Sequence, residues 1–314
     1  MSLRARHRGA PLAAERIRMR VSRPVLGLSL LIVVLSVVAT LVPMCWTGDR
    51  IARSILTTRA QAVALGSGFY RHDSLFIAAG FRGQDLITLG TGAPLLLLAT
   101  IRCWKRASPR RVLLLVAILA YFLYVYASMA FGAAYNELFL VYVALFSASL
   151  FALAGAWRAA AAAGLSATAG TLPRRGPGVL MLASGAVTLA VWLIPILSAL
   201  AKGEPPALLD HYTTMVTYAL DLGIVTPLAL ASGVLILRGN PAGYRLAIPL
   251  LGIIVMLAPT IIASTIFQHV AGVVFSAPAI VGPIAGFVAM GGFAIWAVVA
   301  ILRRVSGNDA VPTV

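Results

Sequence analysis

The stretch TYALDLGIVTPLAL, residues 217–230, is an apolar segment that contains a single carboxylate, Asp221. It belongs to a longer run, Met215–Leu237, and an α-helix needs about 20 mostly apolar residues to cross a membrane. A charged side chain deep inside such a span costs roughly 2.5–3.5 kcal/mol on insertion scales. Asp221 is therefore expected to face neighbouring helices, a partner group or water, and the stretch predicts one helix of a transmembrane bundle.

The composition of the whole chain agrees with a protein embedded in a membrane. Of its 314 residues, 61% are hydrophobic and only 11% are charged, and the mean hydropathy is +0.96. A soluble domain carries roughly a quarter charged residues. The net charge of +16 would suggest nucleic acid in a soluble protein. Here the arginines lie between apolar runs, so we expect the lipid bilayer and no nucleic acid as the partner.

Eight apolar runs are long enough to be membrane spans, which predicts an all-α, polytopic transmembrane helix bundle. The runs are Pro24–Trp46, Asp85–Ile101, Val112–Phe131, Leu138–Trp157, Val179–Ala201, Met215–Leu237, Leu246–Phe267 and Ala279–Leu302. The second run is short, and its helix is expected to begin earlier, near Ser74.

The distribution of basic residues predicts the orientation of the bundle. Basic residues are retained in the cytosol, and eight spans with both termini cytosolic place 19 of the 25 on that side. The other six fall outside: Arg50, Arg53, Arg59, Arg71, Arg82 and Lys202. We predict a protein of the bacterial inner (plasma) membrane. Its parts are a basic cytosolic tail (1–23), a membrane domain (24–304) with a large external loop (47–84), and a short cytosolic tail (305–314).

The external loop is the segment with most room for extra structure. DRIARSILTTRAQAVAL, residues 49–65, spaces apolar and polar residues as in a helix that lies at the membrane interface. HDSLFIAAGF, residues 72–81, is too short to span a membrane and too apolar for water. We expect it to pack on the bundle or to dip into the membrane. A purely structural lid is the alternative for the whole loop.

Polar residues gather on the predicted outer face. The candidates there are His72, Asp73, Asn136, Glu137, Asp210, His211 and His269. Histidine with carboxylates is a frequent metal-ligand set, but two histidines at ligand spacing on one helix are absent from the sequence. The alternative is solvated or capping loop residues. In particular, Asn136 suits a helix N-cap and Glu137 suits a helix N-terminus.

Two further features lie within the spans. Asp85, near the outer end of the second span, is a second candidate buried carboxylate besides Asp221. Each is either a protonatable or cation-binding group or a structural carboxylate bonded to Tyr, Thr or Arg of a neighbouring helix. Tyr121, Tyr124 and Ser128 share one face of the third span. These hydroxyls either line a polar path or hydrogen-bond across the bundle.

The second and sixth spans share a pattern. QDLITLGTGAPLLLLA, residues 84–99, and LDLGIVTPLALA, residues 220–231, each have Asp-Leu near the outer end, then a threonine, then Pro-Leu. Four spans separate them, so a duplication would give a four-plus-four parallel repeat, a plan that transporters use. Chance similarity between leucine-rich helices is the alternative.

One part of the chain carries a family resemblance. GQDLITL, residues 83–89, and YASMAFGAAYNELFLVYVALFSASLFAL, residues 126–153, resemble stretches of an uncharacterised family of bacterial multi-pass inner-membrane proteins. The resemblance covers residues 66–157. It implies a polytopic inner-membrane protein and no particular activity.

Three classes of function fit these observations. The buried carboxylates and the prolines within spans favour a proton- or cation-coupled transporter or permease of a small molecule or ion. The outer histidines and carboxylates favour a membrane redox protein or a metal- or haem-binding protein. A sensor, assembly factor or interaction protein needs only the bundle and its large loop. The sequence identifies no catalytic residue and no cofactor.

The basic asymmetry makes the orientation testable. Reporter fusions at Val314 should report the cytosol, and fusions within Thr57–Leu65 should report the opposite side, because the arginine-rich loops are retained inside. The same result at both sites would contradict the eight-span topology.

Overall fold

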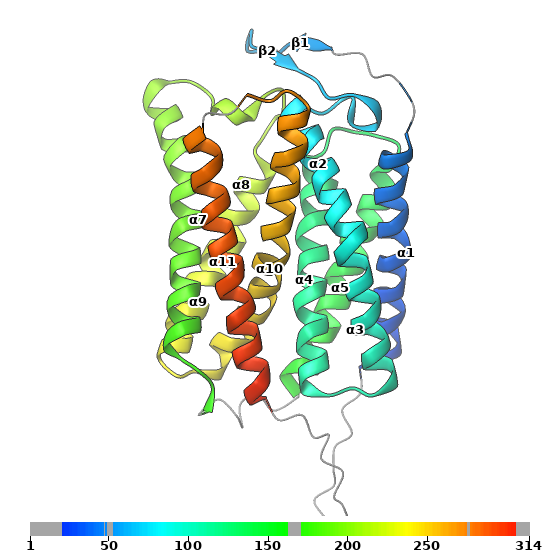
Figure 1. The fold of residues 1–314 in the computed structure, drawn as a ribbon, viewed down its shortest axis with the longest axis vertical. Coiled ribbons are helices and arrows are strands. Elements are labelled where there is room, and N and C mark those ends of the chain that lie inside the picture. The colour runs from blue at the N-terminus through cyan, green and yellow to red at the C-terminus, as the bar shows by residue number, and fades with distance from the viewer. Residues whose placement is uncertain (1–20, 47, 49–52, 163–170, 275–276, 306–314) are drawn as a thin grey trace, which may run out of the picture.

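The computed structural model describes residues 21–46, 48, 53–162, 171–274 and 277–305. Within these residues the chain forms eight helical spans that are long and apolar enough to cross a membrane, which confirms the predicted fold class. The spans stand side by side in one bundle (Figure 1). Most of the two predicted tails, 1–23 and 305–314, lies outside the described residues.

The first four spans follow each other up and down through the bundle. Their helices are α1 (Arg23–Cys45), α2 (Leu75–Ile87), α3 (Ala93–Lys105), α4 (Pro109–Gly132) and α5 (Phe139–Ala162). The second span consists of α2 and α3, which are joined by the π-helical turn Thr88–Gly92. A π-turn inserts one extra residue into the helix and occurs often at functional sites.

The last four spans repeat this alternation. Their helices are α7 (Arg175–Lys202), α8 (Val216–Leu220), α9 (Thr226–Leu237), α10 (Pro241–Val270) and α11 (Ala277–Arg304). Here the sixth span is interrupted, and the π-helical turn Asp221–Val225 joins α8 to α9. Short 3₁₀ turns at Gly68–Tyr70 and Ala207–Leu209 lie in the connections that precede the second and sixth spans.

The second span begins earlier than its apolar run. Ser74 precedes α2 and its hydroxyl accepts a hydrogen bond from the backbone N–H of Ile77, as an N-cap does. The helix therefore starts where the sequence suggested. From Leu75 onward, the stretch HDSLFIAAGF is the first part of a 31-residue span, Leu75–Lys105. The expectation that this stretch only packs on the bundle or dips into the membrane is therefore wrong. The predicted external loop 47–84 accordingly ends at Ser74.

The described part of the connection between the first and second spans forms a β-hairpin. Strands β1 (Ser54–Leu56) and β2 (Ala62–Ala64) pair in antiparallel register, with Ile55 opposite Val63. Between them Ala60 has a positive φ of 57° and closes the turn. The predicted interfacial helix is therefore wrong for residues 53–65. We call residues 53–74 the cap, and Figure 1 shows the hairpin above one end of the bundle.

The two ends of the bundle differ in charge. We call the end below the cap the cap face. The opposite end is the arginine face, where α1 begins and α11 ends (Figure 1). Arg110 there donates to the backbone carbonyls of Val305 (2.6 Å) and Arg303 (3.2 Å), and Arg304 donates to the carbonyl of Thr171 (3.0 Å). These bonds fasten the ends of several spans together at the arginine face.

Helix α10 holds the two halves of the bundle together. It packs against α9 and α11 from its own half and against α2 and α4 from the other. The contact is close because it uses glycine: a Cβ on Gly252 would overlap the backbone of Ala117 in α4. Ser264 and Gln268 of α10 donate hydrogen bonds to the carbonyls of Gly80 (2.8 Å) and Phe76 (3.0 Å) in α2.

This close approach predicts a sharp difference between two glycines. Gly252→Ala should destabilise the bundle by about 1–3 kcal/mol, because α10 and α4 must move apart. Gly27→Ala is the control, because nothing lies within 4 Å of its Cβ position in α1 and alanine is the better helix former. Thermal unfolding in detergent measures both. Equal unfolding midpoints for the two variants would show that α4 and α10 can move apart at little cost in stability.

Candidate functional site

Asp85 is buried inside the bundle below the cap. It lies ten residues into α2, about 15 Å along the helix at 1.5 Å per residue, and it is 2% exposed. The hydroxyl of Tyr70 donates a hydrogen bond of 2.7 Å to its Oδ2. Tyr70 comes from the cap and is itself buried, so the cap supplies the donor that satisfies this carboxylate.

Asp221 is buried in the second half of the bundle. It is 7% exposed and is the first residue of the π-helical turn in the sixth span. The indole N–H of Trp192 in α7 donates a hydrogen bond of 2.8 Å to its Oδ2, and the hydroxyl of Tyr124 in α4 also interacts with the carboxylate. The ring of Tyr218 packs on Trp192 with centroids 4.1 Å apart. Aromatic side chains with polar tips thus surround this acid.

The two carboxylates have similar surroundings. Each belongs to a span with a π-helical turn, and each turn is followed by a residue and then Pro-Leu, at Ala93-Pro94 and Thr226-Pro227. The donors that the structure gives both acids are neutral, a phenol and an indole. Arg82 is one turn before Asp85, and its charge acts on that acid, while its guanidinium donates to the carbonyl (2.7 Å) and hydroxyl (3.3 Å) of Ser67.

Helix α4 lies between the two acids and touches the surroundings of both. Tyr121 shares a 2.8 Å hydrogen bond with Thr88, which opens the π-helical turn after Asp85. Tyr124 reaches Asp221 instead. Among the described residues no partner is found for the buried hydroxyl of Ser128, the third member of the predicted face. The predicted polar face of the third span therefore connects to both carboxylate-bearing spans.

A second polar cluster fixes the cap to both halves of the bundle. Asp73 is 1% exposed, and its Oδ1 accepts hydrogen bonds from the N–H of Ala134 (2.7 Å) and the hydroxyl of Tyr212 (2.8 Å). The Tyr212 oxygen in turn accepts from the N–H of Ser74 at 3.2 Å. Arg59 of the cap donates to the carbonyl of Asp210 at 2.6 Å. The loop before the sixth span is thereby joined to the loop before the second.

The three histidines of the predicted outer face, His72, His211 and His269, do not form a metal-ligand group among the described residues. His211 Nε2 lies 3.0 Å from the carbonyl of His72, and its ring stacks on Tyr212. His269 is exposed in the last turn of α10, and no contact with the other two is found there. Within the described part of the chain, no three His, Cys, Asp or Glu side chains gather closely enough to hold a metal ion.

Asn136 and Glu137 have local structural partners. Asn136 Oδ1 accepts the N–H of Leu138 (3.0 Å) just before α5, and its amide donates to Ala134. Glu137 forms an ion pair of 2.6 Å with Arg71, whose guanidinium also lies over the ring of Trp46. The Arg71 hydrogen bond lowers the pKa of Glu137. Both residues act in the connection between α4 and α5.

Burial has the opposite effect on Asp73. It raises the pKa of this carboxyl group from 3.8 to about 6, although the hydrogen bonds from Ala134 and Tyr212 lower it. The pKa of Tyr212 is raised as well, first by burial and then by the nearby Asp73 charge. Asp73 is thus a titratable group with a raised pKa that joins the cap to the bundle.

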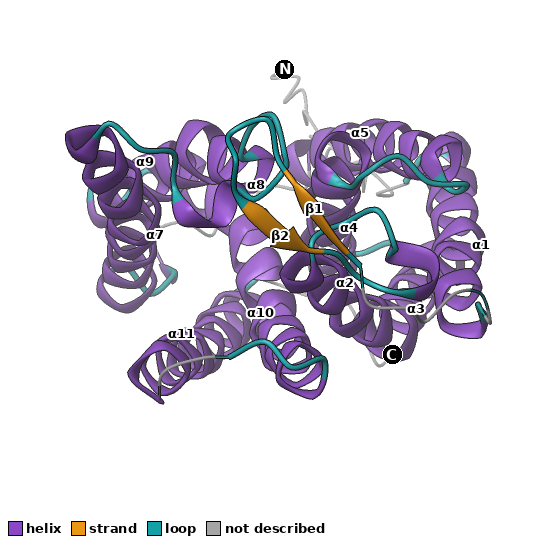
Figure 2. Ribbon diagram, turned by 90° about the horizontal axis from the view of Figure 1, so that it is seen from above, coloured by secondary structure: helices purple, strands orange, loops and turns teal. Residues whose placement is uncertain are grey.

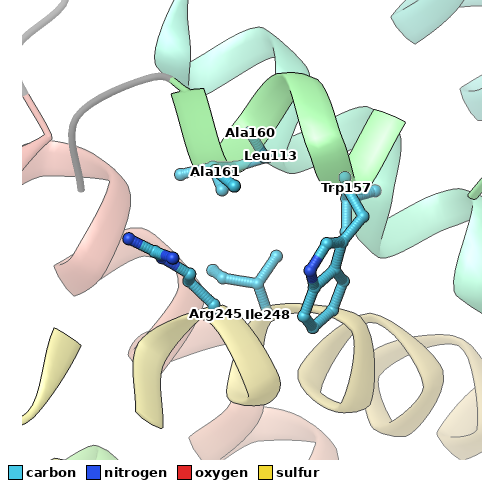
Figure 3. A pocket seen from close by; sticks show the side chains of 7 residues that line it. Leu113, Trp157, Ala160, Ala161, Arg245 and Ile248 are labelled. Carbon is cyan, nitrogen blue, oxygen red and sulfur yellow. The ribbon is translucent and has the colours of Figure 1, made fainter. Parts of the chain in front are cut away.

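Two cavities of the described structure are lined by residues other than the two carboxylates. One between α4, α5 and α10 holds only about 10 Å³, and Figure 3 shows Trp157 and Arg245 on two sides of it. That volume is about enough for one water molecule. A larger groove of about 870 Å³ lies between α7 and α11.

No protein-family model, curated protein or solved structure matches this chain. The site is therefore described by its own geometry. Reasoning from the sequence selected the two acids and the tyrosines of α4. It missed Tyr70 and Trp192 as the partners of these acids. It also missed Tyr212 as the partner of Asp73, although Tyr212 directly follows His211 in the stretch LLDHYTT, residues 208–214.

The raised pKa of Asp73 predicts a pH dependence. Between about pH 4 and 6 the folded protein keeps a proton on Asp73 that the unfolded chain releases, so this group's contribution to stability is lost as the pH rises through that window. Asp73→Asn should flatten the dependence, because an amide oxygen can accept both bonds that Oδ1 accepts.

Unfolding midpoints measured across that pH range check the prediction. Glu137→Gln is the control: the pKa of Glu137 is lowered, so its removal should not change the slope near pH 6. If the unfolding midpoint of Asp73→Asn changes with pH as steeply as that of wild type, other groups produce the pH dependence.

Proposed function

We propose that this chain is a proton- or cation-coupled transporter, or permease, of a small molecule or ion in the bacterial inner membrane. The observation that carries the proposal is the pair of carboxylates, Asp85 and Asp221. Each is buried within a membrane span and accepts a hydrogen bond from a neutral aromatic side chain. Ionisable residues inside membrane spans are costly and usually mark ion or proton pathways.

Neutral donors leave these acids free to change charge. A carboxylate in a buried ion pair leaves its cation uncompensated when it takes up a proton, which costs several kcal/mol. Tyr70 and Trp192 carry no charge, so a proton or a small cation that arrives at Asp221 removes a buried charge and leaves both hydrogen-bond donors neutral. Asp85 likewise accepts from the neutral Tyr70, while the charge of Arg82 acts on it without replacing that donor. This favours reversible occupancy over a fixed structural ion pair.

The helices that carry the acids have points at which they can bend. Each has a π-helical turn directly before a proline-containing turn, and both features interrupt the regular helical hydrogen bonds. Because the acids lie in or next to these turns, a change in their charge acts on the part of the span best able to change shape. Such a coupling is what alternating access requires.

The contacts between halves support a four-plus-four parallel repeat. An exchange of the halves turns the second span into the sixth and the third into the seventh. Under this exchange the α2–α10 contact corresponds to the α8–α4 contact, and the α4–α10 contact corresponds to itself. The structure contains the α2–α10, α8–α4 and α4–α10 contacts. We propose that the halves are related in this way, with Asp85 and Asp221 in corresponding spans.

The alternatives named from the sequence have less support. A metal or haem protein needs a set of ligands, and within the described residues the outer histidines do not provide one. A sensor or assembly factor does not require carboxylates with neutral donors in two separate spans.

A transport assay tests the proposal on Asp221. Wild-type protein in liposomes should give currents that depend on the pH gradient when amines, amino acids, sugars and carboxylates are supplied in turn. Asp221→Asn and Asp85→Asn should abolish those currents, because an amide cannot take up a proton. Glu204→Gln removes an exposed carboxylate instead and should leave them intact.

Two outcomes contradict the proposal. One is the same pH-dependent current in wild type and Asp221→Asn. The other is a wild-type protein that gives no current with any solute of the panel, together with an infrared pH titration in which wild type and Asp221→Asn show the same carboxyl signals.

A further inference from the structure

A long apolar groove lies between the fifth and eighth spans. It measures about 870 Å³ and is formed by α7 and α11, which Figure 2 shows at the edge of the bundle. Its lining combines one arginine with small and apolar side chains: Arg175, Gly176, Val179, Leu180, Ala183, Val288, Ala289, Gly292, Phe293 and Trp296. This groove is far larger than the other cavity and is separate from both carboxylates.

The groove has the depth of one membrane leaflet. On α7 its lining runs from Arg175 to Ala183, about 12 Å at 1.5 Å per residue. Half of the hydrocarbon core measures about 15 Å. At the end nearest the arginine face, the ring of Trp296 packs against Gly176 so tightly that a Cβ there would overlap it.

The charge in the groove lining lies at this end only. Arg175 is the first residue of α7 and is exposed. The N-terminus of α7 adds the positive end of the helix dipole. Every other lining residue is uncharged, so the groove offers an anion site at one end and an apolar slot beyond it.

We propose that the α7–α11 groove binds one anionic phospholipid from the leaflet at the arginine face. Its acyl chain lies along Val179, Ala183 and Gly292, and its phosphate lies at Arg175. Basic pockets between transmembrane helices bind acidic headgroups by this chemistry. The site does not depend on whether the bundle transports a solute.

A second copy of the chain fits the groove less well than a lipid. A transmembrane helix is about 10–12 Å wide with its side chains and pairs along a length near 30 Å. The lining covers only about 12 Å of α7. A single acyl chain with a phosphate at its end matches both the length and the position of the charge.

Two variants remove the two halves of the proposed site. Arg175→Gln removes the charge at the headgroup end. Gly292→Leu fills the slot, and it does so without a clash because nothing lies within 4 Å of the Gly292 Cβ position. The matched controls are Arg102→Gln, an exposed arginine of α3 outside the groove, and Gly286→Leu, an open position of α11 outside the lining.

Native mass spectrometry of the full-length protein in micelles supplies the readout, with phosphatidylglycerol or phosphatidylcholine as the added lipid. Wild type should retain one phosphatidylglycerol in preference to phosphatidylcholine. Arg175→Gln should lower the affinity for phosphatidylglycerol about fivefold, the usual effect of one basic residue near a membrane surface. Gly292→Leu should abolish retention of both lipids, and both controls should behave as wild type.

Several results would overturn the proposal. Equal retention of the two lipids by wild type would show only a general lipid shell. Unchanged retention by Gly292→Leu would place the lipid elsewhere. Efficient disulfide dimerisation of Ala289→Cys, with lipid retention unaffected by Arg175→Gln, would show that a second copy covers the groove.

Discussion

A carboxylate in the hydrocarbon core of a membrane has no water to bond, so every donor it uses must come from the protein. This constraint shapes the bundle around Asp85 and Asp221. It requires Tyr70 of the cap to enter the bundle and Trp192 of α7 to turn inward. It also explains the position of α4, whose tyrosines face two different spans and whose close contact with α10 through Gly252 brings the halves together.

The spans could be predicted from the sequence because hydrophobicity is local and continuous. The same holds for the start of the second span, since Ser74 is a capping residue directly before an apolar helix. The hairpin could not be predicted in this way. Residues 53–65 carry no glycine or asparagine at the turn, Ala60 adopts a positive φ instead, and the spacing of Ile55 and Val63 fits a helix as well as a strand.

The partners of the acids are non-local. Trp192 is 29 residues from Asp221, and Tyr212 is 139 residues from Asp73. No periodic pattern connects such positions, so the sequence indicates that a buried acid needs a donor without indicating which one. The histidines of the predicted outer face do not form a metal site among the described residues for a related reason. A shared side of the membrane places residues within one broad surface, whereas a metal site requires them within a few ångströms.

The bond between Tyr212 and Asp73 also orders events during biosynthesis. Asp73 and its first donor, Ala134, are made with the first half, but its second donor arrives only once the fifth span has crossed the membrane and Tyr212 has followed it. Until then the buried carboxyl has one partner and Ser74 has not yet bonded the tyrosine oxygen. The cap of the first half is therefore completed by the second, and a ribosome that stops between the halves leaves the cap, which supplies Tyr70 to Asp85, without the bond from Tyr212.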